Sequence, residues 1–557
     1  MIALHRALFF LLLVTPIALL GAEGCDPVPG TGMLPPGEPT GDDDDGVDDD
    51  DDDDDDEEPA EPGDPGDDPG DPGDPGDPGD DPGNPEPPEP PEPPTPYVAG
   101  AVISGVSAFQ AIEVPLVEPV TSGRASAEAD GAVLAPPIVA GRDVLLRASV
   151  ALEPEYMMQS VTAEFVIDDG DGPVTITDTM VLRADSTPDD LDSTFNVSVP
   201  GVMINPVTTV SVRLLQTTPS TLIGDAAAAS WPDAGAADLG AIENGGQLIV
   251  RIVPLEYAPD GSDRLPDTST EQIDLMTSWL ERLYPANSVT VTVDPPLAVD
   301  APILANGTGW SDALYQLTDL REVRSVGADE YVYGMVQPGT SFSDYCRSGC
   351  VSGLGWRSDD PTAAFTRTSL GLGFTGQRAA DTFVHELGHN HGRMHAPCGG
   401  PSNTDPNYPH GDGRLGSWGY DVVEDALVSP SVFADLMGYC RPRWVSDYTW
   451  EALSDRIAWV NASASMEPAP GWPKRLRVMD VNVDGLARLR GTIPVDRAPE
   501  GPTAKIEVLN SRGVVLERIT AYEQVFEDNG TRALLFEAPK RLDAFAVRLP
   551  GGAPLTL

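Results

Sequence analysis

Four of the six histidines in the chain lie close together, and their spacing indicates metal chemistry. His385 and His389 are four residues apart, so on a helix their imidazole rings share one face and can reach the same ion. Glu386 follows the first ring and leans over the same ion. Gly392 can adopt a positive φ, which lets the chain turn back and bring His395 to a third position. Three neutral imidazoles leave one position of a tetrahedral zinc ion for water, as in catalytic sites.

The pattern His-Glu-x-x-His-x-x-Gly-x-x-His resembles the signature of the metzincin clan of zinc peptidases. That clan also has a methionine-containing turn beneath the metal, and Met437 lies at a suitable distance along the chain. In astacin- and serralysin-like metzincins, the tyrosine two residues after this methionine stabilises the oxyanion, and Tyr439 matches that position. The resemblance implies one catalytic Zn²⁺, with Glu386 as the general base of peptide hydrolysis. A structural or adventitious histidine cluster is the alternative.

The resemblance to the clan covers mainly residues 246–462 and depends on these two motifs. The segment 385–390 also looks like the adamalysins, although Ala396 stands where that family has aspartate. The β-rich region upstream and the helix start at Pro266–Ser269 loosely resemble secreted bacterial metzincins of the StcE mucinase type. The implied substrates are extracellular proteins or glycoproteins.

The elements that must position these residues alternate between strands and helices. Residues 248–253 are typical of a buried strand, and Ser269 with Gln272 forms a capping-box pattern that starts a helix. We therefore expect an α/β (α+β) domain over residues 246–465, and the resemblance implies that it is a metzincin-like catalytic domain. Tyr331–Val336 is either an edge strand that pairs with an extended substrate or an ordinary buried strand.

Two β-rich regions flank this domain. Short strands separated by turns predict a β-sandwich over residues 97–245, and this region could also act as a pro-segment. A small C-terminal β domain is expected over residues 466–557. Within it, Asp480–Gly485 resembles the start of a calcium loop, but Gly491 stands where the last ligand should be, so a hairpin turn is favoured.

The other cysteine and histidine residues have separate interpretations. Cys346, Cys350, Cys398 and Cys440 form an even set in an exported chain, so disulfides are expected, with metal ligation as the alternative. If the methionine turn lies under the metal-binding helix, the pairs are Cys398–Cys440 and Cys346–Cys350. On an ideal helix His391 points away from His385, which indicates a packing role. His410 lies in a polar loop and is expected to be exposed.

The N-terminus is typical of an export signal. His5 and Arg6 precede an apolar run over residues 7–20, and small residues follow it. Cys25 resembles the lipidated cysteine of bacterial lipoproteins, although Ala22 and Glu23 depart from the usual pattern there. Ordinary cleavage after Gly24 is the alternative. We expect residues 1–24 to be a signal peptide and the protein to be an outer-membrane or cell-surface lipoprotein, or secreted.

Residues 25–96 are expected to be a disordered acidic tether rich in proline and glycine. Residues 26–96 hold 29 acidic residues and no Lys or Arg, which accounts for half of the net charge of −57. Calcium binding by Asp48–Asp56 is possible, but a solvated spacer is favoured. So acidic a chain repels nucleic acid, and we expect membrane contact only through a lipid anchor.

Together these patterns predict an exported zinc metalloendopeptidase that hydrolyses extracellular protein or glycoprotein substrates. The alternative, from a different class, is a surface adhesin or glycan-binding protein whose peptidase domain is secondary or inactive.

Overall fold

Alternating apolar residues build two antiparallel sheets at the start of the described chain. The computed structural model describes residues 96–116, 136–217, 222–464, 469–528 and 530–557. Strand β5 buries every second residue, and the inward faces of both sheets share one hydrophobic core. One sheet has the order β2-β1-β4-β7, and the other has the order β10-β8-β5-β6 with β9 beside β8. Their bounds are β1 (Ala101–Phe109), β2 (Glu113–Leu116), β4 (Val144–Leu152), β5 (Ser160–Asp168), β6 (Pro173–Val181), β7 (Phe195–Val199), β8 (Thr209–Gln216), β9 (Ser230–Trp231) and β10 (Ala237–Asp238).

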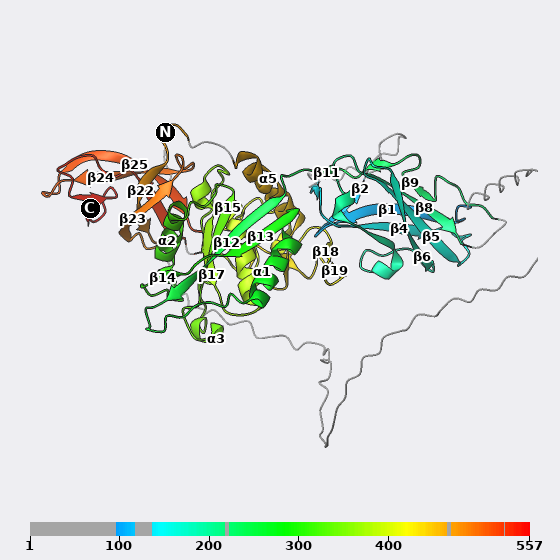
Figure 1. Cartoon of the computed structure of the whole chain (residues 1–557), viewed down its shortest axis with the longest axis horizontal. Coiled ribbons are helices and arrows are strands. Elements are labelled where there is room, and N and C mark those ends of the chain that lie inside the picture. Colours follow the sequence, from blue (N-terminus) through cyan, green and yellow to red (C-terminus); the bar gives the residue numbers. More distant parts are fainter. Residues whose placement is uncertain (1–95, 117–135, 218–221, 465–468, 529) are drawn as a thin grey trace, which may run out of the picture. The chain divides into compact units, whose positions relative to one another are not determined.

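The central part of the chain forms a mainly parallel sheet with the order β13-β12-β15-β17-β16, and β14 pairs with β12 (Figure 1). Strands β12, β15 and β17 run parallel, and β16 runs antiparallel to β17. The apolar run of β12 is buried along most of its length, as expected for a strand covered on both faces. The strands are β12 (Gln247–Tyr257), β13 (Ser288–Val293), β14 (Leu297–Val299), β15 (Glu330–Val336), β16 (Gly353–Gly355) and β17 (Thr368–Leu372).

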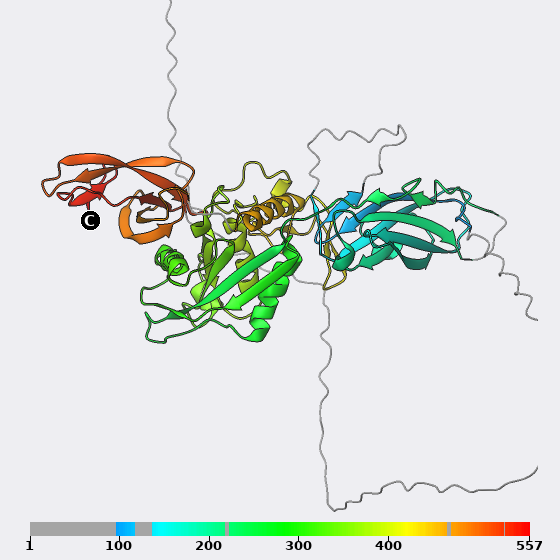
Figure 2. The same ribbon diagram turned by 45° about the horizontal axis from the view of Figure 1, so that its top comes forward.

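Helices cover both faces of this sheet (Figure 2). Apolar residues of α1, α4 and α5 share one core with the sheet, and apolar residues of α2 share another. The Ser269 hydroxyl accepts a hydrogen bond from the Gln272 amide at the start of α1, as the capping pattern predicts. The helices are α1 (Thr270–Leu283), α2 (Trp310–Val323), α3 (Phe342–Tyr345), α4 (Gln377–Asn390) and α5 (Asp447–Ser463).

The interpretation of Tyr331–Val336 as an edge strand is wrong. These residues belong to β15, which pairs with β12 on one side and with β17 on the other. The backbone amide and carbonyl groups on both edges of β15 are therefore paired within the sheet. The buried-strand alternative is correct. The edge beyond β17 is formed by the short antiparallel strand β16.

Residues 474–556 form a single antiparallel sheet with the order β23-β22-β26-β25-β24-β27-β28. The chain turns between β22 and β23 through Asn482–Leu486, so the acidic loop there is a hairpin turn, as expected. One face of this sheet shares the hydrophobic core of α2 and the central sheet. The strands are β22 (Lys474–Val481), β23 (Ala487–Val495), β24 (Thr503–Leu509), β25 (Val515–Val525), β26 (Arg532–Phe536), β27 (Ala546–Arg548) and β28 (Leu555–Thr556).

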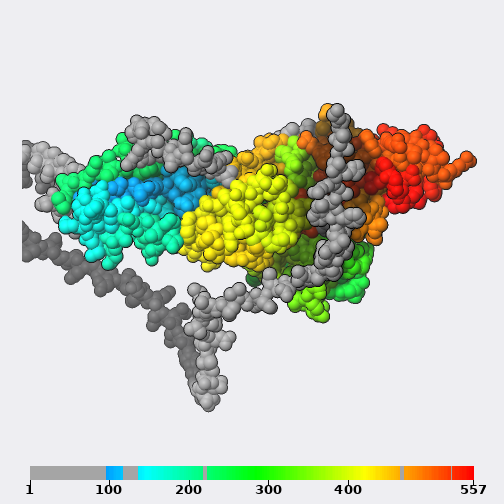
Figure 3. Space-filling view, turned by 180° about the vertical axis from the view of Figure 1, so that it is seen from behind, coloured from blue at the N-terminus to red at the C-terminus, as the bar shows by residue number. Residues whose placement is uncertain are grey.

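Short elements link the parts of the chain. Strand β3 (Ile138–Val139) pairs with β11 (Ala241–Ile242), and β20 (Ala434–Asp435) pairs with β21 (Arg443–Trp444). The hairpin of β18 (Gly419–Asp421) and β19 (Ala426–Val428) lies against the N-terminal sheets (Figure 3). There the ring of Tyr420 packs against Phe109.

The predicted signal segment 1–24, Cys25 and the acidic segment up to residue 95 lie outside the described residues. Within the described part of the chain, no helix has both the length and the apolar character that crossing a membrane requires.

Candidate metal centre

Helix α4 carries the first two histidines of the motif. Its inner face is apolar, with Phe383, Val384 and Leu387 buried in the central core. His385 and His389 lie one turn apart, and their ring centroids are 4.9 Å apart. The helix ends where Gly392 adopts φ 86°, a left-handed conformation that favours glycine. The chain then turns back and brings His395 to the same place, as the sequence predicts.

Each of the three rings is fixed by a hydrogen bond from Nδ1 to a backbone oxygen. The partners are Leu436 O at 2.8 Å for His385, Arg393 O at 2.8 Å for His389 and Ser402 O at 2.7 Å for His395. A carbonyl oxygen only accepts, so Nδ1 carries the proton and Nε2 keeps a lone pair. This arrangement is typical of histidines that bind a metal through Nε2.

The converging nitrogens fit a metal ion. Nε2 of His385 and of His389 is buried without a hydrogen-bond partner among the described residues. Burial lowers the pKa of His385 well below its usual range, and the neighbouring rings lower it further. Burial also lowers the pKa of His389 to about 4, so both rings are neutral near pH 7. A buried cluster of unprotonated nitrogens is compatible with a shared metal ion.

Glu386 lies beside this cluster and is almost completely buried. Its Oε2 has no hydrogen-bond partner in the described part of the chain. Burial raises the pKa of Glu386 well above its usual range, and Asp528 raises it further. The carboxyl group fits here because residue 353 is glycine, since a Cβ on Gly353 would lie 2.0 Å from Glu386 Oε1. A poorly solvated carboxyl group next to the nitrogens is suited to exchanging a proton with a bound water.

Met437 lies beneath α4, in the turn that follows β20. Its sulfur occupies the space in front of Gly388, where an added Cβ would come within 2.3 Å of it. The Met437 amide donates to Asp435 Oδ1 at 2.8 Å, and its carbonyl accepts from the Ala396 amide at 3.1 Å. The turn therefore supports the helix and the third histidine together.

Tyr439 follows this turn and reaches the cluster from the side. Its hydroxyl lies 3.3 Å from His395 Nε2 and 3.3 Å from Asp528 Oδ1. Partial burial raises the pKa of Tyr439, and Asp528 raises it further, so the phenol keeps its proton at neutral pH. The hydroxyl is a hydrogen-bond donor next to the place where the three nitrogens converge.

Both disulfides join the pairs expected from the sequence. Cys346 and Cys350 are bonded, and Cys398 and Cys440 are bonded. The second bond ties the segment after His395 to the residue after Tyr439. These four cysteines are therefore not metal ligands in this structure.

The two other histidines considered from the sequence lie outside the cluster. His391 is buried and stacks on Tyr331, with ring centroids 4.6 Å apart. This is the packing role expected for it. His410 is partly exposed, and its Nε2 lies 2.6 Å from Asp447 Oδ1 at the start of α5.

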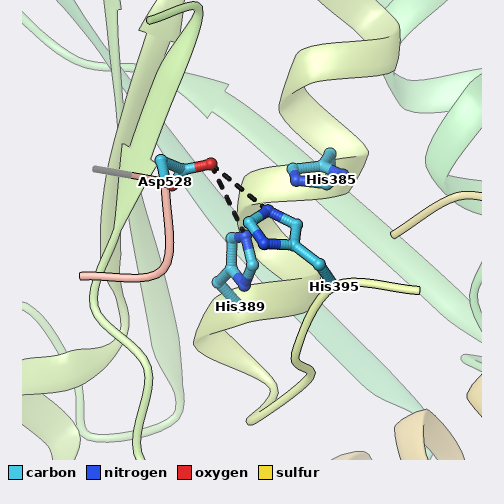
Figure 4. A group of neighbouring side chains, drawn as sticks. All are labelled: His385, His389, His395 and Asp528. Atoms are coloured by element: carbon cyan, nitrogen blue, oxygen red, sulfur yellow. Dashed lines mark ion pairs between the residues drawn. The ribbon is translucent and has the colours of Figure 1, made fainter. Parts of the chain in front are cut away.

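One member of the cluster cannot be found from the sequence motif. Asp528 lies between β25 and β26, and its carboxylate faces the three rings (Figure 4). The candidate ligand atoms of His385, His389, His395 and Asp528 all lie within 4.8 Å of one another. The sequence around Asp528 indicates only a turn, and no spacing rule links it to the histidines.

A cavity of about 380 Å³ opens next to the cluster. Glu386 and Tyr439 line it, and so do Val351 and Ser352, which come just before the edge strand β16. Arg443 also lines it and donates to Cys440 O at 3.2 Å. The cavity therefore brings the polar cluster and the end of the central sheet to one surface.

Residues 361–440 match the model of the Peptidase M66 family. The match contains all three histidines, Glu386 and Tyr439. It supports a metallopeptidase.

Other comparisons add little to this match. None of the curated proteins matches the chain. A solved calcium-binding mutant of Bacteroides uniformis beta-glucuronidase 2 aligns with 45% of this chain at 12% identity, with a TM-score of 0.13. The alignment spans only 25% of that protein, and a similarity so weak carries no argument.

Proposed function

We propose that the protein is an exported zinc endopeptidase in which an N-terminal β-sandwich precedes a metzincin-like catalytic domain along the chain. The main support is the convergence of three Nε2 lone pairs beside the buried carboxyl group of Glu386. Imidazole nitrogens in this number and arrangement suit zinc. A zinc ion bound here would lower the pKa of a water molecule and polarise the carbonyl group of a peptide.

The residues around the cluster have separate roles in this proposal. Glu386 takes a proton from the attacking water on its carboxylate and later gives it to the leaving amine. Tyr439 donates a hydrogen bond from its hydroxyl to the oxyanion that develops on the carbonyl. Nδ1 of His385, His389 and His395 donates to a backbone carbonyl in each case, which orients the three rings with Nε2 toward the site.

An extended peptide is the substrate that this surface suits best. Strand β16 pairs only with β17 among the described strands, so it forms one edge of the central sheet beside the cavity. A peptide that adds to this edge would run past Glu386 and Tyr439. The proposed substrates are extracellular proteins or glycoproteins, and we propose anchoring through Cys25 or release from the cell after export.

The test is cleavage of casein and of a mucin by the purified, zinc-loaded protein. We expect Glu386→Gln to lower kcat by about 10²- to 10⁴-fold, because general acid–base catalysis contributes that much. Zinc content should be unchanged, since Glu386 is not among the grouped ligand atoms. Glu281→Gln, at an exposed position near the end of α1, is the matched control and should keep full activity.

Two results would reject the proposal. One is cleavage that persists at the parent rate in Glu386→Gln. The other is a metal-loaded parent that cleaves neither substrate but binds glycans or cells, which would favour the adhesin alternative.

A further inference from the structure

The C-terminal part of the chain places a carboxylate beside the three histidines. Asp528 lies just after β25, far along the chain from the histidine motif. Its Oδ1 is 3.4 Å from His395 Nε2 and 3.9 Å from His389 Nε2 (Figure 4). The same oxygen lies 3.3 Å from the hydroxyl of Tyr439.

These separations are close to those between the ligands of one ion. Zinc bonds to imidazole nitrogen and carboxylate oxygen are about 2.0–2.2 Å long, so neighbouring corners of a tetrahedron lie about 3.3–3.6 Å apart. The carboxylate oxygen therefore lies close enough to two of the three nitrogens to share an ion with them. A catalytic zinc ion would leave its fourth position for water.

We propose that Asp528 is a fourth ligand of the metal and that it closes the site in the resting protein. The inference rests on the proposed function, because it describes regulation of the same centre. Four protein ligands are typical of closed structural zinc sites, whereas catalytic sites keep one position free. Substrate binding then requires Asp528 to leave the fourth position.

The residues before Asp528 hold it in place. Phe526 is fully buried, and its ring lies 4.9 Å from that of Trp356. The side chain of Glu527 forms an ion pair with Arg357. Phe526 and Glu527 are thus attached to the central part of the chain by apolar and charged contacts.

Glu527 is also hydrogen-bonded to the segment that follows His395, the third histidine. Ser402 Oγ donates to Glu527 O at 2.6 Å, and Ser402 O accepts from His395 Nδ1 at 2.7 Å. Asp528 and His395 are therefore oriented through one residue. A carboxylate held in this way is positioned as a ligand rather than as a solvent-exposed charge.

The charge and hydrogen bonds of the cluster agree with a closing role. Three neutral imidazoles contribute no negative charge, so one carboxylate lowers the net charge around a divalent ion to +1. Tyr439 lies within hydrogen-bond distance of Asp528 Oδ1, so its hydroxyl is engaged by the carboxylate. Removal of Asp528 would free both the fourth position and the Tyr439 hydroxyl.

The experiment measures metal binding and peptide cleavage separately in Asp528→Ala and Asp528→Asn. We expect zinc affinity, measured by competition with a chelating dye, to fall at least about tenfold in Asp528→Ala. The visible absorption bands of the cobalt-loaded protein should shift, because a carboxylate is replaced by water. Cleavage of a short peptide at saturating zinc should become faster than in the parent.

Asp484→Asn is the matched control, since Asp484 is exposed in another hairpin turn of the same sheet. It should keep the parent affinity, spectrum and rate. Circular dichroism shows whether each variant is folded. If Asp528→Ala does not fold, Asp528→Asn provides the measurement, because asparagine keeps the shape of the side chain.

Each other outcome has a defined meaning. Parent-like affinity and an unchanged cobalt spectrum in both Asp528 variants would show that Asp528 is not a ligand. A shifted spectrum with slower cleavage would show that Asp528 supports catalysis and would overturn the closing role. A parent protein that binds neither zinc nor cobalt would instead reject the proposed function.

Discussion

Glu386 has room for its carboxyl group only because residue 353 carries no side chain. A Cβ there would lie 2.0 Å from Glu386 Oε1, which is closer than real contacts allow. We therefore expect Gly353→Ala to displace Glu386 and to lower kcat by about 10²-fold, because small errors in the position of a catalytic group are that costly. Kinetics with a short peptide would measure the change.

The matched control for this change is Gly105→Ala. An added Cβ at Gly105 meets no atom within 4 Å, and Gly105 lies in β1 of the N-terminal sheets. Its kcat should equal that of the parent. Equal rates in Gly353→Ala and the parent would show that Glu386 does not need its present position.

His391 is one of three buried histidines, with His385 and His389, whose protonation should weaken the metal-free protein in acid. Burial lowers the pKa of His391 to about 3, below the value near 6.5 of the unfolded chain. Between these values only the unfolded state takes up the proton, so stability falls as pH falls below about 6.5. The loss is about 1.4 kcal/mol for each pH unit.

The test compares His391→Phe with the parent, both free of metal, by urea unfolding between pH 7.5 and pH 4.5. Phenylalanine keeps a ring against Tyr331 but cannot take up a proton. Leu387 O still accepts from the backbone amide of residue 391. The free energy of unfolding of the variant should therefore fall less steeply, and parallel curves would contradict the lowered pKa.

The sequence was sufficient to find the residues whose chemistry depends on short spacing. The three histidines, Glu386 and Gly392 lie within one helix and its turn, where geometry follows directly from residue number. Asp528 could not be found in this way, because its approach depends on how the C-terminal sheet packs. Gly353 was missed for the same reason, since only the fold brings it against Glu386.

Among the structural elements, the turn around Met437 is held by the bond between Cys398 and Cys440. This bond closes a long loop, so replacing both cysteines by serine should lower the free energy of unfolding by about 2–4 kcal/mol. Zinc affinity should fall as well, because the Met437 carbonyl accepts from the amide of Ala396, next to the proposed ligand His395. Thermal unfolding and dye competition measure the two effects.

Replacing Cys346 and Cys350 by serine is the control for this element. That bond spans only four residues of sequence separation, so it constrains the unfolded chain much less. We expect a smaller loss of stability and the parent zinc affinity. Equal losses of affinity in the two double variants would contradict a specific role for the Cys398–Cys440 bond.

Most strands and helices follow from sequence periodicity, but the edge of the central sheet does not. β15 is long and apolar, which is equally typical of an edge strand and of a central one, and its neighbours depend on topology. β16 consists of Gly353, Leu354 and Gly355, a composition that does not favour a strand. Pairing with β17 alone defines it.

At the scale of the whole molecule, the C-terminal sheet shares one hydrophobic core with α2 and the central sheet, which belong to the proposed catalytic domain. Phe526 is at its centre, packed against Trp356. Phe526→Ala should lower the free energy of unfolding by about 3–5 kcal/mol, because it leaves a cavity in this core. Leu542→Ala, at a fully exposed position in the same part of the chain, should change it by less than about 0.5 kcal/mol.

Urea unfolding followed by circular dichroism and by cleavage activity provides the measurement. If the two parts depend on each other, both signals should be lost at a lower urea concentration in Phe526→Ala. Loss of only the C-terminal sheet, with full activity retained, would show that the catalytic domain is stable without it.

The shared core also bears on how the protein is made. Synthesis proceeds from the N-terminus, so a ribosome that has completed the histidine motif has not yet added Phe526 or β25, the strand just before it. Until those residues emerge from the ribosome, the ring of Trp356 lacks its contact with Phe526. A nascent chain therefore cannot close the core around Trp356 until the C-terminal strands have left the ribosome.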